Sequence, residues 1–414
     1  MAKRSGRKVY RNSTNAKKKR AKKAAGVFIS IIIFAILVFV GYSVAKPIVN
    51  YFSMESDNQG NVMPWTPPIA DNAEASGVQN EVLDSESESN TVSAEEEQTE
   101  EQKQNLINDG FTAYMLPDDA LTSQSKLNDY INRAKSEGYN AVLVTMKSKG
   151  GKINYATESE FALKDESVIS GTLTANQVAD SIRSSGMYAI AVLNLLEDNS
   201  RYGENRDGSY HNSDGSTWLD NSVANGGKPW LSPFENDTVS YIAFLANEIT
   251  SAGFDAVVSD GLSFPVFRNS DLNLIGESVK SPERYKSLIN IINVINSVTS
   301  SRNIENIVLI NAADVLNGKE EVFKPELLSE GTSVIVEFSP DELSNTVIFD
   351  NQEIVLSDMT DSEKFDVVFS ILNELEKDRL QLIPMIRHND YDQAEFDKII
   401  TILINEDYVS YVVQ

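Results

Sequence analysis

Acidic side chains stand at the carboxyl ends of apolar segments that are typical of strands buried on both faces. Asp260 closes the segment G-F-D-A-V-V-S-D, and Glu337 stands at the end of Ser333 to Phe338. In parallel α/β folds these ends carry ligands and chemistry, because the loops there vary while the strands hold the residues in place. Two carboxyls that face each other across one mouth could cleave a glycosidic bond. We therefore predict Asp260 and Glu337 as a catalytic pair.

Each of these acids also has a simpler structural interpretation. Asp260 belongs to a D-G pair, which is common in turns, so it could cap the turn that follows. Glu337 stands near Pro340 and could be a solvated or capping acid. Glu197 and Asp198 follow a third apolar segment and open a polar loop, where a solvated role is the simpler one. Asp198 is kept as a candidate for substrate binding.

Three further side chains are predicted to bind substrate. Lys147 follows the second apolar segment, where it could orient a sugar hydroxyl, neutralise Asp260 or form a structural ion pair. Trp218 and Trp230 lie in a polar insert, residues 199–237, and aromatic rings there suit stacking on the apolar faces of sugars. The alternative is that these rings hold a long loop in place.

The sequence disfavours several other chemistries. It contains no cysteine, which excludes disulfides, thiolate nucleophiles and thiolate metal sites. His211 and His388 lack metal-ligand spacing, so we predict no metal. No motif supports a serine triad, and no glycine-rich phosphate loop opens a helix, so we predict no cofactor either.

The first 46 residues have the pattern of a membrane anchor. Met1 to Lys46 carries twelve basic residues and no acid, and an apolar run from Gly26 to Ala45 is about long enough to cross a bilayer. The positive-inside rule then places residues 1–25 in the cytoplasm, residues 26–46 in the membrane and the rest outside. A cleaved signal peptide is the alternative, but Val44-Ala45-Lys46-Pro47 is a poor cleavage site. The basic tail needs no nucleic-acid partner, because orientation and anionic lipids explain it.

Residues 47–107 are predicted to be a disordered acidic linker. They have no sustained apolar period and are rich in Ser, Asn, Pro and Glu. Such a segment cannot bury enough surface to offset its ordering entropy, and its like charges extend it. A cation-binding role is disfavoured, because the spacing of the acids does not suggest convergence on one ion.

Strand-like and helix-like segments alternate through residues 108–414, which predicts a parallel sheet with helices outside it. The predicted strands are 111–115, 141–146, 188–196, 254–258, 307–311, 333–338, 380–386 and 408–413, with a hairpin at 346–356. The predicted helices are 125–136, 174–184, 237–251, 282–300, 362–375 and 395–404. Eight strands in about 300 residues fit an α/β fold of the (β/α)8 TIM-like barrel type. An open doubly wound sheet is the alternative.

Two stretches of this domain resemble a known family. Asn140 to Ser148 reads N-A-V-L-V-T-M-K-S, and Gly151, Ile153 and Tyr155 follow. After W-L-S-P-F at Trp230 comes G-F-D-A-V-V-S-D-G-L-S-F-P. Both are similar to a family of bacterial envelope glycosyl hydrolase domains with a barrel related to amylase-like glycosidases. The resemblance implies a glycosidase-like (β/α)8 barrel. It covers Phe111 to about Pro265, and the rest only by segment order.

Departures from the family pattern matter as much as the matches. Thr145 and Ser148 stand where the family carries acids after its second strand. Gly261 and Ser263 replace the tyrosine and arginine after its fourth-strand aspartate, which Asp260 preserves. The sequence therefore leaves two functions open. One is an anchored extracytoplasmic glycosidase acting on an envelope or extracellular glycan, and the other is a non-catalytic barrel that binds glycan or protein at the cell surface. The sugar, the linkage, the stereochemical outcome and the oligomeric state do not follow from the sequence.

Overall fold

Eight parallel strands close into a barrel in the order β1-β10-β9-β6-β5-β4-β3-β2. The computed structural model describes residues 110–158, 169–200, 208–376 and 379–414. The barrel strands are β1 (Thr112–Met115), β2 (Ala141–Lys147), β3 (Tyr188–Asn194), β4 (Ala256–Asp260), β5 (Glu305–Asn311), β6 (Ser333–Phe338), β9 (Gln381–Ile386) and β10 (Tyr411–Val413). The predicted (β/α)8 TIM-like barrel is thereby confirmed, and the open doubly wound sheet is wrong.

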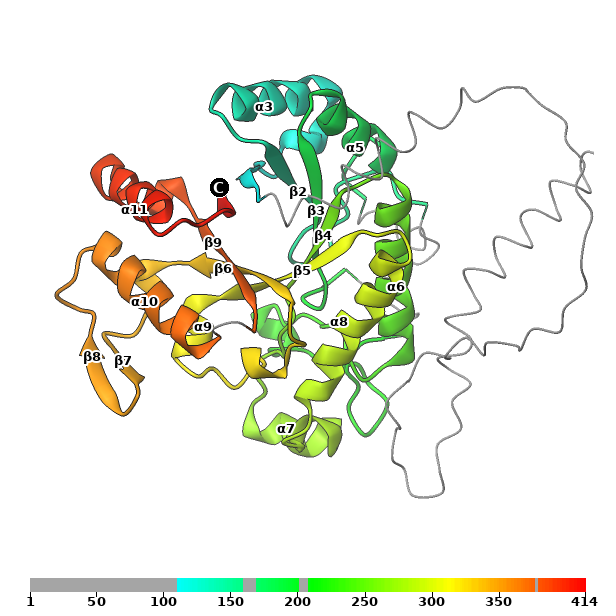
Figure 1. Cartoon of the computed structure of the whole chain (residues 1–414). Coiled ribbons are helices and arrows are strands. Elements are labelled where there is room, and N and C mark those ends of the chain that lie inside the picture. The colour runs from blue at the N-terminus through cyan, green and yellow to red at the C-terminus, as the bar shows by residue number, and fades with distance from the viewer. Residues whose placement is uncertain (1–109, 159–168, 201–207, 377–378) are drawn as a thin grey trace, which may run out of the picture. The chain divides into compact units, whose positions relative to one another are not determined.

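Helices lie on the outside of this barrel (Figure 1). They are α3 (Gln124–Ser136), α5 (Ala175–Ser184), α6 (Asn236–Ser251), α7 (Asn269–Ile275), α8 (Tyr285–Ser300), α9 (Ala312–Leu316), α10 (Asp361–Leu375) and α11 (Gln393–Asn405). Local sequence fixes several helix starts. Thr174 and Gln177 form a capping box that begins α5, and Thr360 and Glu363 form one that begins α10.

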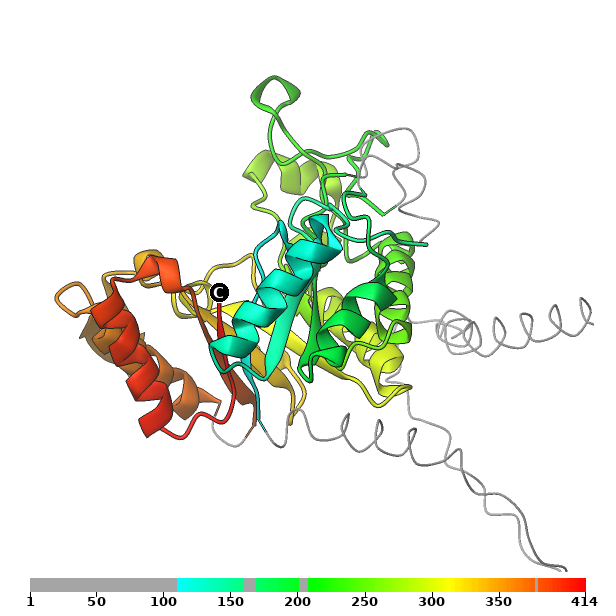
Figure 2. The same cartoon turned by 90° about the horizontal axis from the view of Figure 1, so that it is seen from above.

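The barrel closes where the two ends of the domain meet. β1 pairs with β10 as well as with β2, and the backbone N–H of Phe111 donates to Ser410 Oγ at 3.0 Å. Figure 2 shows the C-terminal end beside the first strands. Because all eight strands of the closed ring are parallel, their carboxyl ends all lie at one mouth.

Most of the predicted elements are confirmed to within two or three residues, and two short helices are additional. The predicted hairpin is β7 (Thr346–Phe349) and β8 (Gln352–Val355), joined through Asp350 and Asn351 with φ of 48° and 60°. This positive φ at both central residues is typical of a type I′ turn. The helices α7 and α9 have only seven and five residues, too few for a helical period to show in the sequence.

The predicted tail, membrane helix and acidic linker, residues 1–107, lie outside the described residues. Within the part of the chain that the structure describes, no helix is both long and apolar enough to cross a membrane.

Candidate active site

Inward-facing side chains fill the barrel in layers. Side chains alternate along each strand, and the inner cluster takes alternate residues such as Ala141 and Leu143 of β2 or Ala256 and Val258 of β4. The next inward position toward the mouth is polar on seven of the eight strands, all but β1. These residues are Thr145, Asn194, Asp260, Asn311, Glu337, Arg387 and Gln414. An apolar barrel core is therefore covered at its mouth by a polar layer, the mouth layer.

Asp260 is the last residue of β4, and its carboxyl is held by two hydrogen bonds. The backbone N–H of Gly261 donates to Oδ1 at 2.6 Å, and Asn194 Nδ2 donates to Oδ2 at 3.1 Å. Burial raises the pKa of Asp260, and the two hydrogen bonds and the positive charges of Lys149 and Arg387 oppose this only in part. A carboxyl with a raised pKa at a barrel mouth is suited to donate a proton.

Gly261 allows Asn194 to reach this carboxyl. Its φ is +65°, and a Cβ atom at Gly261 would lie within 2.5 to 2.7 Å of the side-chain amide of Asn194. Asn194 is only 5% exposed, and its Oδ1 has no hydrogen-bond partner among the described residues. One amide thus orients Asp260 with its nitrogen and leaves an acceptor in the mouth layer for a ligand.

We expect Gly261→Ala to destabilise the domain and to displace Asn194. A non-glycine residue at positive φ costs about 1 to 3 kcal/mol, and here the clash with Asn194 adds to that cost. Gly318→Ala is the matched control, because Gly318 has φ +64° and an added Cβ would meet nothing within 4 Å. Urea unfolding of both variants checks this. Equal losses in the two variants would show that the contact with Asn194 is unimportant.

Glu337 lies on β6, and Arg387, directly after β9, forms an ion pair with it. The guanidinium also donates from Nε to Gln414 Oε1 at 3.0 Å, so it is held from two sides. Burial raises the pKa of Glu337, Arg387 opposes this, and the negative charge of Asp260 adds to it. The two carboxyls therefore influence each other's ionisation across the mouth.

Register and strand tilt put these two carboxyls at one level. Ser259 pairs with Val308 and Leu309 with Ile335, so Glu337 lies two residues farther along its strand than the position in register with Asp260. In an eight-stranded barrel with a shear of about eight, residues at the same height along the barrel axis are offset by about one position from each strand to the next. Because β6 lies two strands from β4, the two-residue offset brings Asp260 and Glu337 into the same layer.

Lys147 faces away from the mouth because β2 contains an irregularity. Thr145 pairs with the inward Val192, but after a register shift Lys147 pairs with Leu193, whose side chain belongs to the outer core. The extra residue turns Lys147 out of the barrel. Its Nζ donates to the backbone oxygen of Asn194 at 2.7 Å, and the side chain is 1% exposed.

Asp198 is the ionic partner of Lys147. Lys147 Nζ lies 3.0 Å from Asp198 Oδ2, and the side chain of Asp198 is fully buried. Burial alone would raise the pKa of Asp198, but Lys147 and the hydrogen bonds from Ser200 outweigh it and lower the pKa. The sequence predicts that Lys147 and Asp198 bind substrate. The structure instead places them against each other, away from solvent, in the structural ion pair that was the alternative for Lys147.

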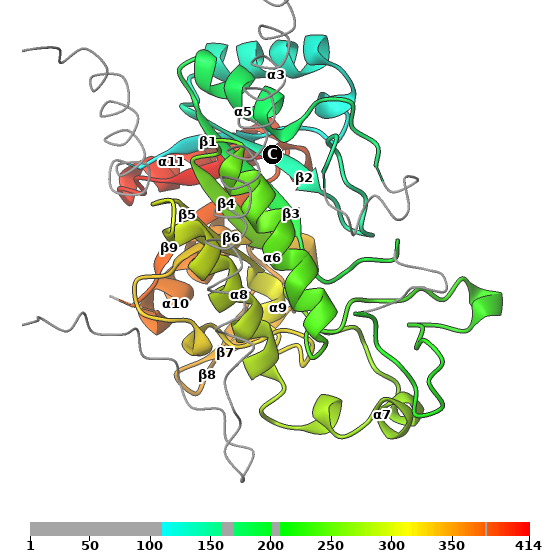
Figure 3. The same ribbon diagram turned by 90° about the vertical axis from the view of Figure 1, so that its right-hand side faces the viewer.

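The aromatic residues of the insert pack on one another and on Phe264 and Phe267, which follow β4. Trp218 is 2% exposed, and its ring centroid lies 5.1 Å from that of Phe267 and 5.9 Å from that of Tyr210. Trp230 is half-buried and donates from Nε1 to Asp220 at 3.3 Å. Figure 3 shows the insert beside α7, where Ser213 N–H donates to the backbone oxygen of Leu274 at 2.7 Å. The placement of Trp218 fits loop support, whereas Trp230 keeps some exposed surface.

Two functional candidates were not predicted from the sequence. Asn194 ends β3, and Arg387 follows β9, so each stands at the strand-end position by which Asp260 and Glu337 were found. The alternation of inward residues along each strand carries the signal for both. Across the described residues, no group of three potential metal ligands converges.

One sequence family and several solved structures are similar to this chain. Residues 113–316 match the sequence model of a family described as "Putative glycosyl hydrolase domain". No curated protein matches the chain. Among solved structures, the PgaB (BpsB) glycoside hydrolase domain from Bordetella bronchiseptica is 14% identical with a TM-score of 0.49, and the match covers 73% of this chain and 92% of that one.

Two further solved structures are similar. The catalytic domain of β-amylase from Paenibacillus polymyxa is 12% identical with a TM-score of 0.44, over 74% of this chain and 92% of that one. A hypothetical protein from Ruminiclostridium thermocellum is 18% identical with a TM-score of 0.38, over 44% and 91%. Similarities this distant say nothing about substrate. The sequence match is the stronger result: residues 113–316, from β1 to α9, match the model of the glycosyl hydrolase domain family.

Proposed function

We propose that this chain is a glycosidase in which Asp260 is the general acid and Glu337 the partner carboxylate. The observation that carries the proposal is the pair itself, two carboxyls in one layer of the mouth of a glycosidase-like barrel. Glycoside hydrolysis needs one carboxyl that gives a proton to the leaving oxygen and another that acts on the anomeric carbon, directly or through water. The mouth layer supplies both.

Their surroundings differ in the way that such a division of roles requires. Burial raises the pKa of both carboxyls, but Glu337 touches the guanidinium of Arg387, which opposes that rise and favours the ionised form of Glu337. Asp260 has no cation in direct contact among the described residues, and burial favours its protonated form. Protonated Asp260 would therefore donate to the glycosidic oxygen while ionised Glu337 stabilises the positive charge at the anomeric carbon.

Hydrolysis of a panel of envelope and extracellular glycans tests this proposal. Peptidoglycan, β-linked glucosamine polymers and α-glucans are incubated with the chain, and newly formed reducing ends are counted. We expect release from at least one of them. Binding of a glycan without any release would favour the second candidate, a non-catalytic surface barrel, which the absence of acids at Thr145 and Ser148 also favours.

Arg387 gives a prediction about pH. In Arg387→Gln the ion pair is lost, so the pKa of Glu337 should rise further, because burial and Asp260 both act upward on it. If ionised Glu337 is required, the acidic limb of the pH–rate profile should move to higher pH. Arg387→Lys keeps the charge and should shift the limb less. An unchanged acidic limb in Arg387→Gln would contradict the role given to this ion pair.

We also propose that the barrel is held outside the cell by the apolar run at residues 26–45, with residues 47–107 as a spacer. The support is the basic cluster before that run and the positive-inside rule. Protease added to intact cells should release a fragment containing the barrel. Full protection of residues beyond 108 would contradict this topology.

A further inference from the structure

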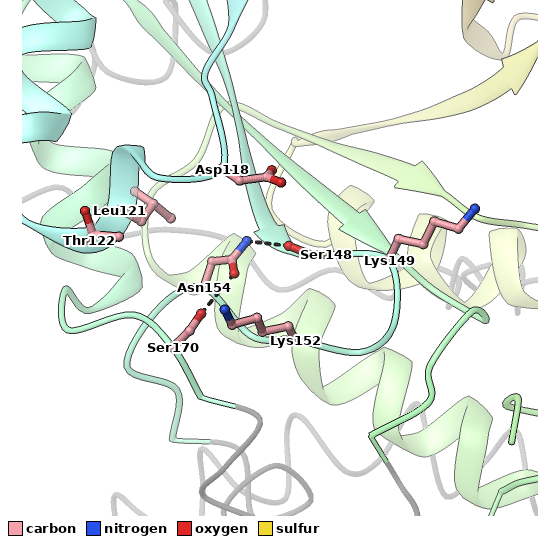
Figure 4. A pocket seen from close by; sticks show the side chains of 8 residues that line it. All are labelled: Asp118, Leu121, Thr122, Ser148, Lys149, Lys152, Asn154 and Ser170. Carbon is pink, nitrogen blue, oxygen red and sulfur yellow. Dashed lines mark hydrogen bonds between the residues drawn. The ribbon is translucent and has the colours of Figure 1, made fainter. Parts of the chain in front are cut away.

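A polar cavity lies beside the mouth. It has a volume of about 330 Å³ and opens between the loop after β1 and the loop after β2 (Figure 4). Its lining residues are Asp118, Leu121, Thr122, Ser148, Lys149, Lys152, Asn154 and Ser170. Neither Asp260 nor Glu337 is among them, so this cavity is distinct from the site of the proposed chemistry.

Its wall is nevertheless joined to the mouth layer. Asn154 Nδ2 donates to the backbone oxygen of Thr145, a residue of the mouth layer, at 2.8 Å. Lys149 points away from the other lining side chains and forms an ion pair with Glu197, and its charge also lowers the pKa of Asp260. The cavity and the mouth layer therefore share part of their structure.

The cavity offers both kinds of hydrogen-bonding group. Asp118 and Lys152 are exposed, and neither side chain has a hydrogen bond or ion pair among the described residues. Figure 4 shows the Lys152 ammonium directed toward Asn154 and Ser170, with Asp118 on the other side of Asn154. A carboxylate only accepts and an ammonium only donates, whereas a sugar hydroxyl does both. The two groups together can therefore accept from and donate to the hydroxyls of a sugar.

The charge and the volume of the cavity limit the class of ligand that it can bind. With Lys149 paired to Glu197, the charges of Asp118 and Lys152 balance, so an anionic group would meet a carboxylate as well as an ammonium. A volume near the lower end of the range for small-molecule sites, about 300 to 1,000 Å³, suits one sugar unit and not a long segment.

We propose that this cavity is a subsite for one neutral sugar unit of an extended glycan, whose neighbouring part lies at Asp260 and Glu337. This rests on the proposed function in that the mouth is taken to bind the same glycan. It adds a substrate class, because a site with two such compartments takes oligosaccharides and binds disaccharides more weakly.

Binding measured by calorimetry on the full chain tests the subsite without requiring turnover. The probes are chitohexaose and cellohexaose, each compared with its disaccharide. Tetragalacturonate is the anionic ligand for comparison. We expect at least one hexasaccharide to bind about tenfold or more tighter than its disaccharide. Asp118→Ala and Lys152→Ala should each remove most of that difference and leave disaccharide binding unchanged. Asp129→Ala and Lys286→Ala, at exposed positions on α3 and α8, are matched controls and should change nothing.

Several results would overturn the subsite. One is equal affinity for the hexasaccharide and its disaccharide, and another is no binding of either hexasaccharide. A third is a loss of affinity in Asp118→Ala that is equal for both lengths. A fourth is that tetragalacturonate binds most tightly and loses affinity in Lys152→Ala. The last would identify an anion site. The proposed function can fail separately. A chain that hydrolyses none of the glycans, or whose Asp260→Asn variant keeps wild-type turnover, would contradict the proposed function and could still show length-dependent binding.

Discussion

Asp260→Asn is expected to lower the rate of glycan hydrolysis by about 10²- to 10⁴-fold, the usual contribution of a positioned general acid. Asparagine keeps the shape of the side chain and can still contact Gly261 and Asn194, but it has no proton of suitable acidity to give. Glu337→Gln should lose a comparable amount, because the charge that faces the anomeric carbon is removed. Initial rates on the glycan hydrolysed by the wild-type chain give both values.

The Asp260→Asn variant should be no less stable than the wild type, although it loses activity. Burial raises the pKa of Asp260, so the ionised form costs folding free energy, and the cost grows as pH rises from about 4 through the raised pKa. Asp260→Asn removes that cost, so its melting temperature at pH 7 should equal or exceed that of the wild type, and the gain should vanish below pH 4. Wild-type turnover in Asp260→Asn would exclude Asp260 as the acid. If Asp260 is a turn cap instead, Asp260→Asn should be mild, because Asn also serves in turns, and Asp260→Leu should destabilise the fold.

Lys147→Met is expected to lower the free energy of unfolding by about 3 to 5 kcal/mol, because it leaves Asp198 charged and unpaired in the interior. The lowered pKa of Asp198 contributes stability above its ordinary value near 4, and that contribution is lost as pH falls. The difference between wild type and variant should therefore be largest near neutral pH and shrink below pH 4. Urea unfolding at several pH values measures it.

A neighbouring lysine supplies the control. Lys149 lies 3.0 Å from Glu197, as close as Lys147 lies to Asp198, but its side chain is 73% exposed. Lys149→Met should change stability by less than about 1 kcal/mol, as exposed ion pairs do. Lys147→Met with Asp198→Leu should recover most of the loss, since no charge remains buried. If the single and double variants unfolded alike, the destabilisation would come from packing and not from charge.

The sequence predicted the barrel because parallel strands covered on both faces leave a simple pattern. Segments such as Ala141 to Lys147 and Ser333 to Phe338 are almost wholly apolar, and helical periods separate them. The same regularity located Asp260 and Glu337 at strand ends. Whether both side chains point into the barrel, and at the same height, depends on side-chain alternation and on the stagger between strands. Both can be assigned only when the pairing of the strands is known.

Other site residues could not be placed by pattern alone. Lys147 looked like a mouth residue because it continues β2, yet one extra residue in the pairing reverses its direction, and no residue type marks that irregularity. Trp218 looked exposed because its neighbours in sequence are polar. Its actual neighbours include Phe267, 49 positions away, and such contacts exist only in three dimensions.

The pairing of β1 with β10 also has a consequence for how the chain folds during synthesis. The hydrogen bond from Phe111 to Ser410 joins positions 299 residues apart, so β1 lacks one of its two neighbours until nearly the whole domain has been made. At about 5 to 20 residues per second, translation leaves that strand edge open for roughly 15 to 60 seconds. Closure is then among the last events, and it requires contacts of the kind that slow folding most. A nascent barrel with an open edge can pair with other chains, so a holding chaperone would matter most during that interval.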